Sequence, residues 1–151
     1  MPKVAIIIGS KSDFPYIKEC EEILKFFNID YEINVISAHR NLDKLRDYLK
    51  NIEEKGVEVI IAGAGYSAHL PGVVASIVKL PVIGIPFDSS PLLGIDALFS
   101  IVQMPKGVPV ATMGIGKAGV FNAIVFAARI LSLKYKEIEN KLEEFRKKLG
   151  S

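Results

Sequence analysis

The chain has 151 residues, of which 50% are hydrophobic and 24% charged, so it is long and apolar enough to form one domain with a substantial core. Its 19 Lys and Arg residues nearly balance its 17 Asp and Glu residues, and the net charge of +2 argues against a dedicated nucleic-acid or membrane-surface protein. A single cysteine, Cys20, excludes an internal disulfide and favours an intracellular protein. The mean hydropathy of +0.31 indicates surplus apolar surface that is buried between subunits.

The N-terminal residues lead directly into an apolar run, Val4–Ile8, with no cleavage-type segment after it, so a cytoplasmic location is expected. The longest stretch without charged residues is Val59–Val78. Glycines, a histidine and a proline interrupt it, and it is therefore predicted to be a buried strand, a glycine loop and a helix rather than a membrane span.

Short apolar runs predict five strands. They cover about Val4–Ile8, Tyr31–Ile36, Val57–Ala62, Val82–Ile85 and Val110–Met113. Apolar residues at helical spacing predict helices between these strands and after the last one. Helices are expected from Ser12 or Asp13 to about Phe27, from Asn41 or Asp43 to Gly56, and over Pro71–Lys79, Leu92–Val102, Ala118–Leu133 and Tyr135–Leu149.

Strands alternate with helices and are apolar on both faces. This pattern predicts a single α/β domain over residues 1–151, a three-layer αβα sandwich around a doubly wound parallel sheet of flavodoxin-like type. Ligands in such folds bind beyond the carboxyl ends of the strands. The loops to search for chemistry are therefore Gly9–Asp13, Ser37–Arg40, Gly63–Gly72, Pro86–Ser90 and Gly114–Gly119.

The first loop joins a strand to the start of a helix. Backbone N–H groups and the hydroxyl of Ser10 favour an anion there, and Asp13 could accept hydrogen bonds from sugar hydroxyls. The alternative is that Ser12 or Asp13 only caps the helix.

The next two loops carry the only histidines of the chain. His39 can exchange a proton near neutral pH, and the adjacent Arg40 can hold a phosphate with two hydrogen bonds. The alternative is a surface histidine beside an arginine paired with Asp43. The third loop combines small residues, among them Gly65, with the second histidine, His69.

Two motifs are set aside. Residues Gly114–Gly119 spell G-x-G-x-x-G, but helix replaces the acidic strand end expected about 20 residues later, so close packing is favoured over dinucleotide binding. Ser67 lies in a partial nucleophile elbow in which His69 replaces the last glycine. No metal is expected, because the two histidines lack ligand spacing.

Six segments taken together resemble the PurE family, the small subunits of phosphoribosylaminoimidazole carboxylase. They are Gly9–Asp13, Ser37–Arg40, Ala62–Gly65 with Ala68–Gly72, Leu80–Gly84, Ser100–Pro105 and Ile115–Gly119. The resemblance extends from Val4 to about Leu131.

This resemblance implies an enzyme of de novo purine biosynthesis. The main branch of the family is N5-carboxyaminoimidazole ribonucleotide mutase, which moves a carboxyl group from N5 to C4 of the imidazole. The other branch carboxylates aminoimidazole ribonucleotide (AIR) directly with CO2, and both make 4-carboxyaminoimidazole ribonucleotide (CAIR). The resemblance further implies a homo-octamer without metal or organic cofactor, in which the C-terminal helix over residues 135–149 packs on a neighbouring subunit.

The roles of the site residues are also carried over from the family. His39 would exchange the C4 proton, and His69 would line the carboxylate side of the pocket. Small residues would keep the pocket dry, and the remaining residues would hold the nucleotide. Ser10, Ser37 and Arg40 would bind the 5′-phosphate, Asp13 the ribose hydroxyls, and Ala64 and Gly65 would form the dry wall.

One departure from the family bears on the choice of branch. Tyr66 and Ser67 stand where the mutase branch usually has small residues, which leaves the handling of CO2 open. Arg40 and the run His69–Gly72 favour the mutase, with the direct carboxylase as the alternative. A nucleotide-binding module without catalysis and a serine hydrolase that uses Ser67 are more distant alternatives.

Overall fold

The computed structural model describes all 151 residues and contains one sheet of five parallel strands in the order β2-β1-β3-β4-β5. The strands are β1 (Lys3–Ile8), β2 (Asp30–Val35), β3 (Val57–Ala64), β4 (Val82–Pro86) and β5 (Ala111–Thr112). This order reverses direction beside β1, as in flavodoxin-like sheets, and such a reversal opens a crevice at the carboxyl ends of β1 and β3. The predicted parallel α/β sheet is confirmed.

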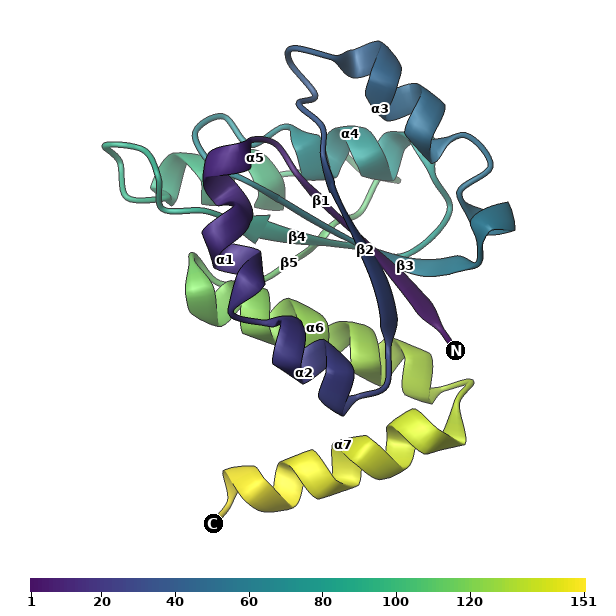
Figure 1. Cartoon of the computed structure of the whole chain (residues 1–151). Helices are drawn as coiled ribbons and strands as arrows, with labels where there is room; N and C mark the ends of the chain where they lie inside the picture. Colours follow the sequence, from purple (N-terminus) through teal and green to yellow (C-terminus); the bar gives the residue numbers. More distant parts are fainter.

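Helices cover both faces of the sheet (Figure 1). One face carries α1 (Phe14–Lys18), α2 (Glu21–Phe26) and α6 (Lys117–Ser132), and the other carries α3 (Leu42–Leu49), α4 (Leu70–Ile77) and α5 (Ile95–Val102). Side chains of β1 alternate between the two cores. Val4, Ile6 and Ile8 join the first, and Ala5 and Ile7 join the second. The three-layer prediction is therefore confirmed.

Two predicted helices differ most from the expected ranges, and the helix expected from Leu92 begins at Ile95. The first is divided into a 3₁₀ turn (Lys11–Asp13), α1 and α2, and a turn at Cys20 separates α1 from α2. The apolar stripe nevertheless continues across this turn, because Ile17, Cys20 and Leu24 are all buried. The helix expected to reach Gly56 ends at Leu49, because the backbone of Lys50 is extended and that of Asn51 turns into the left-handed region with φ +62°.

The last helix, α7 (Lys136–Leu149), packs on its own chain. Ile138 is fully enclosed in the first core, and the ring of Phe145 lies 5.6 Å from Phe27 and 6.0 Å from Phe121. Figure 1 shows α7 outside α2 and α6, as an additional layer on that face. A contact with a neighbouring subunit would have to use the outer side of α7, and that contact stays a prediction.

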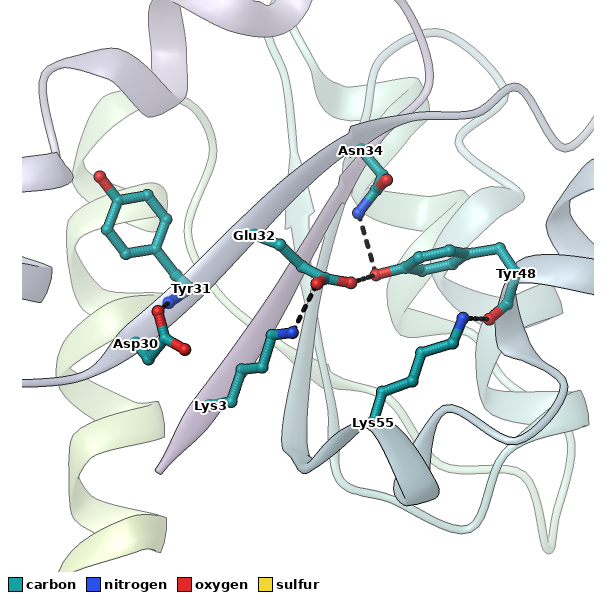
Figure 2. A network of polar contacts seen from close by, with 7 residues as sticks. All are labelled: Lys3, Asp30, Tyr31, Glu32, Asn34, Tyr48 and Lys55. Atoms are coloured by element: carbon teal, nitrogen blue, oxygen red, sulfur yellow. Dashed lines mark hydrogen bonds and ion pairs between the residues drawn. The ribbon is translucent and has the colours of Figure 1, made fainter. Parts of the chain in front are cut away.

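The edge strand β2 differs from the prediction that strands are apolar on both faces. Figure 2 shows its side chains in a polar network with α3. Tyr48 of α3 donates a hydrogen bond to Glu32 and accepts one from Asn34 at 2.9 Å, and Lys3 of β1 pairs with Glu32 at 2.7 Å. An edge strand has only one neighbour, so its outer rim stays accessible to water and tolerates such groups.

The helices are also relevant to the membrane question. None of them is both long and apolar enough to cross a bilayer.

Candidate active site

A cavity of about 620 Å³ opens at the carboxyl ends of β1, β2 and β3. All eight residues expected at the site line it: Ser10, Asp13, Ser37, His39, Arg40, Ala64, Gly65 and His69. A second hollow of about 560 Å³ is lined by the C-terminal ends of α3 and α4 and contains no histidine, serine or tyrosine. The first cavity is therefore the candidate active site, because it contains both histidines of the chain together with an arginine and several serine hydroxyls.

The first wall of the cavity is the turn after β1. Ser10 has extended backbone, and its hydroxyl oxygen accepts a hydrogen bond from the Ser12 amide at 3.3 Å and lies 2.9 Å from the Ser12 hydroxyl. Ser10 thus caps the 3₁₀ turn, while Asp13 takes the N-cap position of α1, one of the two positions expected from the sequence. Asp13 precedes α1 without a capping bond from its side chain.

The carboxyl group of Asp13 is free of a capping role and lies in the cavity wall. Only 5% of the residue is exposed, and burial raises the pKa of Asp13 from 3.8 to about 6. Burial disfavours a carboxylate unless hydrogen-bond donors compensate it. Sugar hydroxyls are donors of this kind.

The second wall is the turn after β2. The Ser37 hydroxyl accepts a hydrogen bond from the Arg40 amide at 3.1 Å, and the Asn41 side chain accepts one from the Lys44 amide at 3.2 Å, which starts α3. This turn presents His39 and Arg40 to the cavity. The guanidinium of Arg40 makes no ion pair, so the alternative of an Arg40–Asp43 pair is wrong. An arginine without an ion pair, in a cavity that Ser10 and Ser37 also line, favours an anion.

The third wall is the loop between β3 and α4. It places His69 so that its Nδ1 lies 2.7 Å from Nε2 of His39, with the two rings nearly perpendicular at 82°. A hydrogen bond between two imidazole nitrogens contains one proton, which either ring can hold. The two histidines, 30 residues apart in sequence, therefore form a proton-sharing pair at the cavity.

Ser67 also lines this cavity, but the base that a serine nucleophile needs is engaged elsewhere. Its hydroxyl makes no hydrogen bond to a histidine, and the nearest histidine in sequence, His69, is bonded to His39. The geometry gives no support to the serine hydrolase.

Sequence reasoning gave no role to Ser89, which the structure places in the cavity wall. A Cβ on Gly65 would lie only 2.1 Å from the Ser89 hydroxyl, so the absence of a side chain at position 65 leaves room for Ser89. The available signal was its position in a strand-end loop, Pro86–Ser90. Ser12, Tyr66 and Leu70 also line the cavity.

The loop Gly114–Gly119 lies outside the cavity. A Cβ on Gly119 would lie 1.8 Å from the carbonyl oxygen of Gly114, so the loop packs its backbone directly on the first turn of α6. The interpretation of this motif as close packing is confirmed.

Comparison with known proteins agrees with this geometry. Residues 3–151 match the family described as AIR carboxylase. A relative from Thermotoga maritima is 58% identical over 149 residues, covering 99% of this chain and 86% of the relative. One from Saccharolobus solfataricus is 58% identical over 145 residues (96% and 90%), and one from Escherichia coli is 48% identical over 145 residues (96% and 86%). All three carry the name N5-carboxyaminoimidazole ribonucleotide mutase.

Solved structures give the same result. The crystal structure of Treponema denticola PurE superimposes with a TM-score of 0.87 at 32% identity, covering 99% of this chain and 92% of that one.

Proposed function

The chain belongs to the AIR carboxylase family, and on this premise we propose that it is an N5-carboxyaminoimidazole ribonucleotide mutase of purine biosynthesis. It is an enzyme of the isomerase class, as the names of its relatives indicate. The observation that carries the proposal is that one cavity is lined by the His39–His69 pair together with Arg40, Ser10 and Ser37.

The nucleotide is held by the turns after β1 and β2. Arg40, Ser10 and Ser37 bind the 5′-phosphate, because an unpaired guanidinium and adjacent hydroxyls match a phosphate in charge and hydrogen-bonding capacity. Asp13 accepts hydrogen bonds from the ribose hydroxyls, which compensates the buried carboxylate.

The reaction needs one proton to be given and one to be taken. The bond between N5 and the carboxyl carbon breaks, CO2 is released, and N5 keeps the electron pair and takes a proton. C4 then attacks CO2 with the ring electrons and forms the new C–C bond. Loss of the C4 proton restores the aromatic imidazole. A single group that donates a proton at N5 and accepts one at C4 therefore balances the protons of the whole reaction.

His39 is the carrier in this scheme. Its hydrogen bond to His69 gives the proton a second place to reside while CO2 is free, and keeps the ring oriented toward the cavity. The step consumes no oxidant or reductant, and the proton balance closes without a cofactor. Ala64 and Gly65 contribute a wall of small, weakly polar groups, beside which CO2 stays until C4 attacks it.

We extend the proposal to assembly and location. A homo-octamer is supported by apolar side chains on and before α5 that are more than 45% exposed in the single chain: Leu92, Leu93, Ile95, Phe99 and Val102. A cytoplasmic enzyme is supported by the one free cysteine, Cys20, which is buried.

The carboxyl donor separates the mutase from the direct carboxylase. Purified protein is given N5-carboxyaminoimidazole ribonucleotide in one assay and AIR with bicarbonate in another, and the formation of CAIR is measured. The mutase converts the first substrate much faster than it carboxylates AIR at physiological bicarbonate. Faster product formation from AIR and bicarbonate would establish the carboxylase instead, and binding of both nucleotides without product would indicate a non-catalytic binding module.

A further inference from the structure

Tyr66 adopts a backbone conformation that its residue type disfavours. Four residues other than glycine have positive φ angles: Asn28, Asn51, Tyr66 and Leu93. Asparagine tolerates this region because its short side chain bonds to the local backbone, whereas a tyrosine with φ +54° is strained. A glycine at position 66 would remove the strain, so an advantage of the side chain must offset it.

The chain itself does not use this side chain. Tyr66 is 59% exposed, its hydroxyl makes no hydrogen bond, and its ring makes no aromatic contact within the protein. Three of the other four tyrosines, Tyr16, Tyr48 and Tyr135, donate hydrogen bonds to carboxylates. The strained tyrosine therefore contributes nothing evident to the fold.

The cavity is where this side chain can act. Tyr66 lines it between Gly65 and Ser67, on the same loop as His69, and it has the only phenyl-type ring among the lining residues. The turn after β2 carries Arg40, which fixes the phosphate end of the nucleotide in the proposed binding mode. A planar aromatic ring at this place has the shape and the apolar face to cover a flat heterocycle.

We propose that Tyr66 covers the imidazole of the bound nucleotide and closes the cavity toward solvent, so that CO2 released from N5 stays beside C4. This proposal rests on the proposed function for the identity of the nucleotide. CO2 is uncharged and makes only weak interactions with hydrogen-bond donors, so a physical barrier is what retains it. The ring provides that barrier, and by stacking on the imidazole it also contributes to the affinity for the nucleotide.

Three variants separate the ring from the backbone strain. Tyr66→Phe keeps the ring, Tyr66→Ala removes the ring and keeps a Cβ in the left-handed backbone, and Tyr66→Gly removes both ring and strain. Urea unfolding checks the fold, and Tyr66→Gly is expected to unfold at a higher urea concentration than Tyr66→Ala. Any loss of AIR affinity or of label retention that Tyr66→Ala and Tyr66→Gly share, and that Tyr66→Phe lacks, is due to the ring.

The first measurement is the equilibrium affinity for AIR by calorimetry, which needs no turnover. Removal of one stacking ring is expected to weaken AIR binding roughly 5- to 100-fold in Tyr66→Ala and Tyr66→Gly. Tyr66→Phe should bind close to the wild-type value. If wild type fails to isomerise its substrate, the proposed function is wrong, and these affinities still decide the role of Tyr66.

The second measurement follows the carboxyl group. Substrate labelled with ¹³C in the N5 carboxyl group is converted in excess unlabelled bicarbonate, and the label in CAIR is measured by mass spectrometry. Wild type and Tyr66→Phe should retain the label, while Tyr66→Ala and Tyr66→Gly should lose part of it and release AIR.

Full retention of label and unchanged AIR affinity in Tyr66→Gly would overturn the proposal. A change in sedimentation with unchanged affinity would overturn it as well, because the ring would then belong to a contact between copies of the chain.

Discussion

Asp13 is the only carboxyl group that lines the cavity, and the fold gives it neither an ion pair nor a capping role. Burial raises its pKa to about 6, so above that pH the free protein holds a carboxylate in a place that disfavours it. Binding residues often lower stability in this way, because the groups that compensate them belong to the ligand. We therefore expect Asp13 to lower the stability of the enzyme without nucleotide and to contribute to nucleotide binding.

The substitution Asp13→Asn tests this cost. The folded pKa of about 6 lies above the unfolded value of 3.8, so the folded state binds more protons between these pH values, and wild-type stability falls as pH rises through that window. Asp13→Asn should raise the free energy of unfolding by roughly 1–3 kcal/mol at pH 7.5, and this gain should vanish near pH 4. Urea unfolding at both pH values measures it.

Asp47→Asn, at an exposed position of α3, is the matched control and should show no such pH-dependent gain. A gain for Asp13→Asn that is equal at pH 4 and pH 7.5 would contradict the account of Asp13.

The sequence predicts which residue types line the site, but not which of their side chains contact one another. The sequence identifies His39, Arg40 and His69 as candidates because such residues are uncommon at the ends of apolar strands. It does not show that the two histidines meet at 2.7 Å, since that distance depends on how two loops are oriented by β2 and β3. Nor does it show Ser89, whose approach depends on the missing side chain of Gly65.

At the scale of elements, the interiors of helices and strands follow from periodicity, and their ends do not. β5 contains only Ala111–Thr112 where four residues were expected, and its pairing with β4 is limited to two positions. Hydrophobic spacing is the same on both sides of Cys20, so only the backbone geometry reveals the turn there. The polar network of β2 was missed for a related reason, since edge position is decided by strand order rather than by the strand itself.

The first turn of α6 offers a test at this scale. Replacing a helical glycine by alanine ordinarily stabilises a helix by about 1 kcal/mol. At Gly119 the new Cβ would lie 1.8 Å from the Gly114 carbonyl oxygen, so Gly119→Ala should instead destabilise the protein by about 3 kcal/mol. Denaturant unfolding measures the change.

Gly114→Ala is the control, because nothing lies within 4 Å of a Cβ built there, and its effect should stay within about 0.5 kcal/mol. Stabilisation by Gly119→Ala would show that the loop and the helix are not packed as described.

At the scale of the whole molecule, a single chain buries both cores, but it leaves apolar side chains of α5 exposed. Phe99 is 62% exposed and Ile95 is 52% exposed on this helix, next to an exposed Leu93 in the preceding turn. Apolar side chains gathered in this way mark association surfaces in soluble proteins. The proposed octamer would bury them.

Phe99→Asp places a charge on this surface without touching either core. The variant should remain folded and dissociate into smaller species in sedimentation velocity, whereas Leu133→Asp, at a 90% exposed position after α6, should leave assembly unchanged. Unaltered sedimentation of Phe99→Asp would exclude α5 from the assembly interface.

The central claim is that His39 moves the proton while Arg40 holds the nucleotide. These roles predict different losses, so we compare His39→Asn and Arg40→Ala, with Arg46→Ala on the exposed side of α3 as the control for a lost surface arginine.

The most direct measurement records both CAIR formation and AIR affinity for each variant. His39→Asn should reduce turnover by at least about 100-fold while binding AIR nearly as wild type does. Arg40→Ala should weaken AIR binding by about 1.5–3 kcal/mol, and Arg46→Ala should change neither quantity. Substantial turnover by His39→Asn, or a loss of its affinity equal to that of Arg40→Ala, would contradict the account.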